Sequence, residues 1–182
     1  MSFCCDFRFV SYVGNESLLA NCLNGWQEEL TALRKALGPV YLYMDQFNGS
    51  SDPEVLLDSL SVVRWIKEDL DSKKDKQFLV VESIKDSSIQ GVGVFTDNFD
   101  QLDYLQTAPS NLRIDLNKEN SKCIRGVGSL IMRKAIELGV ANGCKSMETT
   151  CTESSRGFYT KLGFKTKQSA EIVLHYVSSS GS

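Results

Sequence analysis

Hydrophobic residues recur along this chain with two spacings, one typical of helices and one typical of strands. A spacing of three or four residues, which gathers side chains on one helix face, runs over 17–37 and over a segment that begins at 52. The dipeptide GP at 38–39 ends the first helix. The sequence SDPE at 51–54 opens the second with cap residues and a proline in the first turn. We expect that helix to end in the charged run 69–76, which is most simply a solvated turn.

Alternation with a period of two, together with β-branched and aromatic residues, predicts the strands. They are expected at 7–13, 78–83, 90–96, 111–117, 145–151, 164–167 and 170–177. A polar turn joins 78–83 to 90–96 as an antiparallel pair, whereas the residues between 96 and 111 are interpreted as an acidic loop. In the last third, helices alternate with strands, which implies a crossover and a locally parallel pair. The predicted fold class is α/β (mixed α+β), with a central, mostly antiparallel sheet flanked by helices.

Composition excludes several classes of function. The 182 residues, 42% hydrophobic and 24% charged, suffice for one domain, which we expect to span 1–177 before a disordered tail at 178–182. A net charge of −3 gives no general electrostatic reason to bind nucleic acid or an anionic membrane. No apolar run approaches the roughly 20 residues that cross a bilayer, and no signal peptide is recognisable, so a cytoplasmic protein is expected. Six cysteines without a Cys-x-x-Cys pair, and the single histidine His175, indicate reduced thiols and argue against a metal site.

The stretch CIRGVGSLI at 123–131 places two glycines directly before a helix that is expected to run to Gly143. It does not fit two common phosphate loops. Gly128 is not followed by the Lys-Ser or Lys-Thr of a Walker loop, and Ile131 stands where a dinucleotide fingerprint has its third glycine. Glycines still let the backbone approach an anion, the free N–H groups of a helix start point toward it, and Arg125 adds a positive charge. A phosphate cradle and a plain helix start are therefore both open.

A second motif, GFYTKLGF at 157–164, follows the strand after this helix, and a short helix is expected there. A Gly-x-Gly helix start followed in this order by Phe-Tyr-x-x-x-Gly-Phe is the hallmark of the GNAT superfamily of N-acetyltransferases. The chain from about 77 to 177 resembles the acetyl-CoA-binding half of that family. Residues 1–76 match the family only in the order of their expected elements, and the resemblance implies that they form much of the acceptor side.

The resemblance implies a role for the start of the long helix. The backbone amides of five residues would cradle the diphosphate of acetyl-CoA: Arg125, Gly126, Val127, Gly128 and Ser129. The strands 111–117 and 145–151 would splay apart and admit the pantetheine arm as an extra strand. Its expected contacts are Ile114, Leu116 and Thr152. Main-chain N–H groups would hold the acetyl carbonyl, and no metal is required.

Tyr159 matches the family tyrosine that often serves as general acid. A phenol with a pKa of about 10 can lend a proton to a departing thiolate whose conjugate thiol has a pKa near 8.5. The alternative for Tyr159 is a core aromatic with its hydroxyl tied to the backbone. For the general base, Asp115 is the first candidate because its strand is expected to line the cleft, and Glu82 and Glu148 are alternatives on neighbouring strands. Each of these three acids is more simply an ordinary surface or ion-paired residue.

These motifs predict an acetyl-CoA-dependent N-acetyltransferase that transfers the acetyl group directly to the primary amine of a small-molecule or peptide acceptor. Three positions depart from the family pattern. Cys123 stands where Gln or Arg is usual, and Thr152 and Ser155 replace the usual asparagine and alanine. The departures favour the alternative, a catalytically degenerate relative that binds an acyl-CoA or a protein partner.

The acceptor itself and the oligomeric state are not readable from the sequence. Acidic residues near the expected acceptor side would suit a cationic substrate, although ordinary solvation explains them equally well. These residues are Asp45, Asp52 and Asp58.

Overall fold

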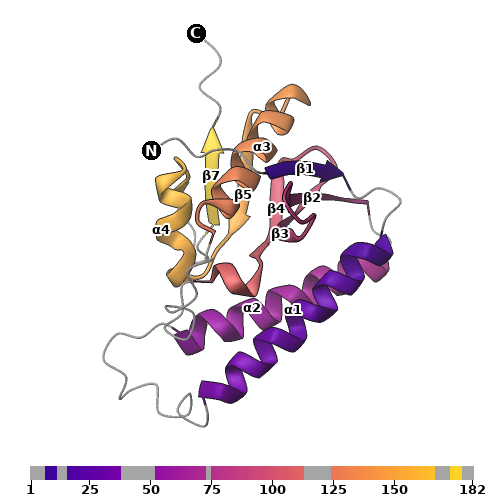
Figure 1. Cartoon of the computed structure of the whole chain (residues 1–182). Coiled ribbons are helices and arrows are strands. Elements are labelled where there is room, and N and C mark those ends of the chain that lie inside the picture. The colour runs from indigo at the N-terminus through magenta and orange to yellow at the C-terminus, as the bar shows by residue number, and fades with distance from the viewer. Residues whose placement is uncertain are drawn as a thin grey trace.

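The structure is a computed structural model that describes residues 7–11, 16–37, 52–72, 75–112, 124–166 and 173–177. The strands of these segments form one mixed sheet in the order β1-β2-β3-β4-β5-β7-β6 (Figure 1). They are β1 (Phe7–Ser11), β2 (Lys76–Ser83), β3 (Ile89–Thr96), β4 (Gln101–Thr107), β5 (Ser146–Thr150), β6 (Lys165–Thr166) and β7 (Val173–Val177). The helices are α1 (Glu16–Leu37), α2 (Asp52–Ser72), α3 (Val127–Ala141) and α4 (Glu153–Lys161), with the short 3₁₀ helix η2 (Pro109–Asn111) after β4.

The sheet has one parallel pair within an otherwise antiparallel arrangement. Strands β1 to β4 form an antiparallel meander, and β5, β7 and β6 are also joined antiparallel. Only β4 and β5 run parallel, because α3 carries the chain across the sheet between them. The predicted mixed, mostly antiparallel sheet with one parallel pair is confirmed.

Helices cover both faces of this sheet. Helices α1 and α2 lie side by side on one face, and α3 lies on the other (Figure 1). Alternation along β2 sends Val80 toward α2, where it joins Ile66 in one core cluster. Leu79 and Val81 point the opposite way and join Ile131 of α3 in a second cluster. The two apolar layers hold α2 and α3 at fixed positions on opposite sides of the strands.

Two glycines of β3 bring α3 close to the sheet. A Cβ atom added at Gly91 would lie 2.7 Å from Val127 Cγ1, and one added at Gly93 would lie 2.7 Å from Ile131 Cγ2. Both distances are too short for a real contact, so a larger residue in β3 would push α3 outward. Because Val127 is the first residue of α3, the small β3 residues fix where that helix begins.

Most predicted elements are present with small changes of boundary. Helices α1, α3 and α4 and strands β2, β3 and β5 correspond to segments predicted from the spacings and from the two motifs. The charged run 69–76 was interpreted incorrectly as a solvated turn. Helix α2 continues through Ser72, Asp69 is only 8% exposed, and Lys76 begins β2 in an ion pair with Asp103. Asp71, Ser72 and Asp75 of this run are exposed, whereas the burial of Asp69 is offset by the positive charge of Lys76.

The acidic loop predicted between 96 and 111 is wrong, because these residues contain β4. A β-bulge explains the error: Val94 of β3 pairs with Tyr104 and Phe95 pairs with Leu102, which leaves Asp103 as an extra residue. The extra residue interrupts the apolar alternation that identifies a strand. The strand predicted at 111–117 is also misplaced at its start, because Asn111 ends η2; residues 113–117 lie outside the described residues.

Candidate active site

The two parallel strands part soon after they meet. Their pairing consists of Gln101 with Glu148 and Leu102 with Thr149. Beyond these residues β4 stays with β3 and β5 stays with β7, so the facing edges of β4 and β5 separate. The bulge residue Asp103 comes directly after the last pair, and a bulge bends its strand and increases the local twist. The structure therefore places the parting of the strands between β5 and β4; most of the segment 111–117, the predicted partner, lies outside the described residues.

Helix α3 begins with exposed, uncapped backbone beside this gap. Its N-cap Gly126 has a left-handed backbone (φ 89°), and no side chain caps the helix. The first turn contains no acidic residue, and the preceding Arg125 is exposed. Amide N–H groups at a helix start carry partial positive charge and lack partners within the helix. This end of α3 is therefore suited to bind an anion through its backbone.

Strand β4 and helices α3 and α4 meet at Gly128. A Cβ atom added at this residue would lie 3.3 Å from Phe158 Cζ and 3.6 Å from Leu105 Cδ2. Val127 is 1% exposed and anchors the same turn in the core. The five residues predicted to cradle a diphosphate therefore lie together, at the point where β4 and α4 approach each other.

Tyr159 lies in the core, with its hydroxyl directed at the place where β4 and β5 part. The side chain is 6% exposed, and its ring contacts those of Phe158 and Phe164 edge to face, with centroid distances of 4.9 and 5.7 Å. Burial raises the pKa of the Tyr159 hydroxyl far above its usual value, although a hydrogen bond with the Thr149 side chain partly opposes the shift. Thr149 is the last β5 residue paired with β4. The phenol is therefore neutral and sits beside the gap.

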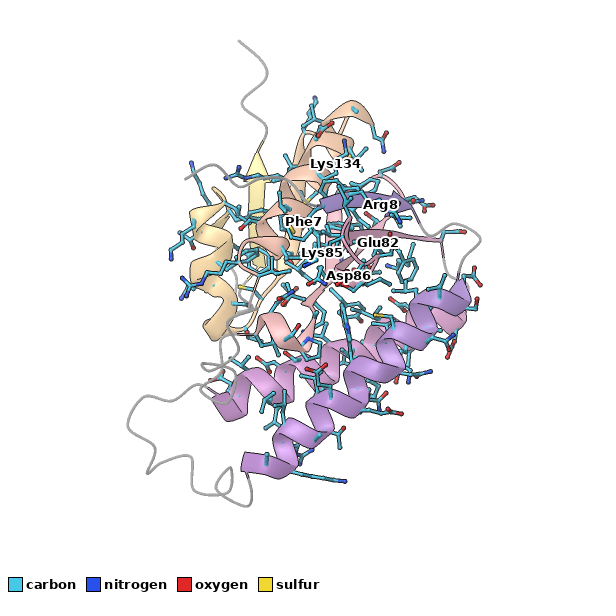
Figure 2. All side chains as sticks on the ribbon, in the orientation of Figure 1. Phe7, Arg8, Glu82, Lys85, Asp86 and Lys134 are labelled. Carbon is cyan, nitrogen blue, oxygen red and sulfur yellow. The ribbon has the colours of Figure 1, made fainter. Side chains whose placement is uncertain are left out.

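The three carboxylates considered as bases have separate locations. Glu82 of β2 forms an ion pair with Arg8 of β1, with Arg8 Nη2 2.8 Å from Glu82 Oε2 (Figure 2). Strand β2 lies two strands away from β4, so Glu82 is remote from the gap. Glu148 lies on β5 at the last residues paired with β4 and is half-buried. Asp115, like Ile114 and Leu116, lies outside the described residues. Of the acids considered, Glu148 is the one that the described structure brings to the gap.

The face of the gap toward α2 carries an aromatic pair. Tyr104, directly after the bulge, stacks on Trp65 of α2 with ring centroids 5.7 Å apart. Trp65 is 39% exposed, and the Arg64 guanidinium lies 6.0 Å from its ring centroid. Glu148 alternates with Thr149, which faces α4, so Glu148 belongs to the same face as Tyr104.

Thr152 begins α4 as its N-cap. The backbone N–H groups of Ser155 and Arg156 each donate to its carbonyl at 3.1 Å, and its hydroxyl lies 3.1 Å from the Ser155 hydroxyl. Thr152 and Ser155, which depart from the family pattern, therefore interact with each other at the start of the helix that carries Tyr159.

The sequence interpretation missed Asn111 and the whole of β4. Asn111 is 9% exposed and hydrogen bonds to Ile124, two residues before Gly126. The available signal was the apolar pair Leu102 and Leu105 within the acidic segment, which keeps a strand pattern once one extra residue is allowed for. No pattern in the sequence marks the contact between Asn111 and Ile124.

Two kinds of feature are absent from the described part of the chain. It contains no group of three or more histidine, cysteine or acidic side chains arranged to hold a metal ion. Its helices also include none with the length and apolar character needed to cross a membrane.

Comparisons with known proteins agree with this geometry. A family model described as the acetyltransferase (GNAT) family matches residues 125–164, from the start of α3 to the end of α4 and the residues just after it. The comparison with curated proteins found no match.

Three solved structures share the fold at low sequence identity. A GCN5-related N-acetyltransferase from Rhodopseudomonas palustris is 14% identical, with a TM-score of 0.55, over 94% of this chain and 95% of that one. The N-acetyltransferase PseH of Campylobacter jejuni is 11% identical, with a TM-score of 0.53, over 96% and 99% of the two chains. Tetrahymena GCN5 is 13% identical, with a TM-score of 0.51, over 94% and 95%.

Proposed function

We propose that this chain, which shares the fold of GNAT acetyltransferases and matches their family model over residues 125–164, binds acetyl-CoA and transfers the acetyl group directly to a primary amine. The observation that carries the proposal is the convergence of three features at one place. The uncapped start of α3, the separated edges of β4 and β5, and the Tyr159 hydroxyl all lie around Gly128 and Thr149.

We propose that the donor is held mainly by backbone. The diphosphate would accept hydrogen bonds from the N–H groups of Gly126 to Ser129, where the helix dipole and Arg125 favour negative charge. The pantetheine arm would lie along the edge of β4 after Asp103, where this strand has left β5. These β4 residues replace Ile114 and Leu116 as the proposed contacts, because β4 is the parallel partner of β5.

The residues around the gap supply the proton transfers. As the amine nitrogen bonds to the acetyl carbon, the carbon–sulfur bond breaks and the negative charge moves to sulfur. Tyr159 is neutral and would donate its hydroxyl proton to that thiolate, although burial, by raising the pKa, also makes this phenol a weaker acid than an exposed tyrosine. Glu148 would take the proton that the amine loses, directly or through a water molecule, and it now precedes Asp115 as the candidate base because it lies at the gap. The acceptor would approach over the face that carries Tyr104 and Trp65, since Glu148 belongs to that face.

A second candidate function is acyl-CoA binding without turnover. It is favoured by the burial of Tyr159 and by its hydrogen bond with Thr149, which would have to be exchanged before the phenol could serve a substrate. Under this alternative the same helix start holds the diphosphate, and Tyr159 only supports α4 against β5.

Calorimetric titration with acetyl-CoA, followed by measurement of thiol release, tests both candidates. The amine panel should include polyamines, aminoglycosides, lysine peptides and neutral amines, because the acceptor class is unknown. Binding with amine-dependent thiol release supports the transferase. Binding without release by any amine supports the alternative, and a folded protein that does not bind acetyl-CoA contradicts both. A cationic acceptor is contradicted if only the neutral amines are acetylated.

A further inference from the structure

A chain of hydrogen bonds connects the turn before α3 to the protein surface. The Ile124 N–H donates to Asn111 Oδ1 at 2.9 Å, and Asn111 Nδ2 donates to Gln90 Oε1 at 2.9 Å. Gln90 Nε2 then donates to Ser88 Oγ, and the Ser88 hydroxyl donates to Asp86 Oδ1, each at 2.6 Å. Every donor in this series points the same way, toward the carboxylate of Asp86. Figure 2 labels Asp86, which follows β2 in the turn to β3.

The two amides at the centre of this chain are buried. Asn111 is 9% exposed and Gln90 is 8% exposed. Burying an amide without hydrogen bonds is unfavourable, and two apolar side chains would avoid that penalty altogether. Hydrogen bonds are directional, whereas apolar contacts are not. An apolar pair could fill the same space, but only an acceptor such as Asn111 Oδ1 fixes the position of the Ile124 N–H.

The Asn111–Ile124 bond closes a loop in the chain. Residues 112–123 lie between the two bonded residues in the sequence. The bond therefore links the polypeptide segment that follows β4 to the segment that precedes α3. Asn111 is itself fixed to β3. Ala108 donates to the Gln90 carbonyl at 2.9 Å, and the Asn111 N–H donates to the Ala108 carbonyl at 2.8 Å. The start of β3, helix η2 and the turn at Ile124 therefore form one connected unit.

We propose that Asn111 is a positioning residue for the diphosphate of the donor, and that Gln90 holds it in place. By accepting the Ile124 N–H, Asn111 fixes the approach to Gly126, and so determines where the amides at the start of α3 point. The inference rests on the proposed function, because the diphosphate is the ligand assigned to that helix start.

The first test compares two donors that differ in the diphosphate. Asn111→Ala should weaken acetyl-CoA binding about tenfold, as expected if one amide at the start of α3 loses its hydrogen bond to the charged diphosphate. The variant should bind S-acetyl-pantetheine, which lacks the diphosphate, with the same affinity as the wild type. Asn111→Asp keeps an oxygen that can accept from Ile124, but it replaces the Nδ2 that donates to Gln90 Oε1 by a second acceptor and adds a negative charge, so it should not recover the affinity for acetyl-CoA.

A matched control separates positioning from general loss of stability. Val63 is fully buried in the cluster on the opposite face of the sheet, so Val63→Ala should lower the melting temperature without touching the turn. If Asn111→Ala and Val63→Ala weaken both donors equally, Asn111 has only a structural role and the proposal is overturned.

Hydrogen exchange tests the proposal without any ligand. The Leu130 N–H donates to the Gly126 carbonyl at 3.0 Å and reports on the first turn of α3. In Asn111→Ala, exchange in the segment 124–130 should become faster while exchange in 136–142, at the other end of the helix, stays as in the wild type. Unchanged exchange in 124–130 would overturn the proposal even if acetyl-CoA binds. Faster exchange there, with no acetyl-CoA binding by the wild type, would contradict the proposed function and the diphosphate as ligand, and would support only the part of the inference that Asn111 fixes the start of α3.

Discussion

Gly126 and Gly143 flank helix α3 and form a natural pair for testing the anion cradle. Both have a left-handed backbone, with φ of 89° and 84°, and a Cβ atom added to either meets nothing within 4 Å. Alanine at each site therefore introduces the same backbone strain and no clash inside the protein. The two sites differ in one respect that concerns function: Gly126 begins the helix, where the diphosphate is proposed to bind, and Gly143 follows its end.

The expected magnitudes follow from this geometry. A left-handed conformation costs an L-residue about 1–2 kcal/mol, so each variant should lose roughly that much stability. For a protein of this length, each kcal/mol corresponds to about 2–4 °C in melting temperature, which gives a fall of about 2–8 °C for both. The Gly126→Ala methyl would also occupy the open side of the cradle. Loss of one hydrogen bond to a charged phosphate, about 1.5–3 kcal/mol, would weaken acetyl-CoA binding roughly 10- to 150-fold.

Thermal melting and calorimetric titration of the two variants provide the measurement. Similar melting temperatures with a selective loss of affinity in Gly126→Ala would support the cradle, because strain alone acts equally in both. Wild-type affinity in Gly126→Ala would refute the reasoning. So would an equal loss in both variants, since Gly143 lies at the far end of the helix.

Three further predictions concern single side chains. Tyr159→Phe should lower the turnover rate about 100-fold and leave acetyl-CoA affinity unchanged in steady-state and titration measurements; unchanged turnover would favour a structural role. Burial raises the pKa of the Cys22 thiol to about 11, so its alkylation at pH 8, followed by mass spectrometry, should be about 100-fold slower in the folded than in the unfolded protein. Hydrogen bonds from Ser88 lower the pKa of Asp86 from 3.8 to about 2, so this stabilisation is present above pH 4 and lost toward pH 2; urea titrations should show a weaker acid dependence in Ser88→Ala.

The sequence predicted those parts of the fold that follow a regular spacing. Helix α3 keeps a helical spacing of its apolar residues, and the apolar, β-branched runs of β2 and β3 indicate strands although their register shifts between Val81 and Glu82, so the positions of all three were identified closely. Strand β4 was missed because the bulge at Asp103 shifts its apolar residues by one position. The bulge lies directly after the last pairing with β5, so the irregularity that hid the strand is also found where β4 and β5 part.

The candidate site shows the same difference between features that follow a local sequence pattern and features that do not. The candidate cradle could be proposed from the sequence because glycines before a helix leave a local pattern, and Tyr159 was singled out by its motif; both roles remain proposals. Asn111 was invisible because its partners, Gln90 and Ile124, lie 21 and 13 residues away in sequence. Such contacts depend on how β3, η2 and the turn before α3 come together, and a local pattern carries no information about that.

The departures from the family pattern are tolerable if the donor is held by backbone. A side chain that contacts the donor can be replaced when the N–H groups supply most of the binding, and Thr152 and Ser155 show one replacement, because their hydroxyls interact at the start of α4. The backbone positions are harder to replace. Gly126 needs its left-handed conformation, and any side chain at Gly128 would press against Phe158. If the chain is an active transferase, variation should therefore be accepted at Thr152 and Ser155 and rejected at Gly126 and Gly128. If it has lost CoA binding altogether, alanine at Gly126 should matter only for stability, to the same extent as alanine at Gly143.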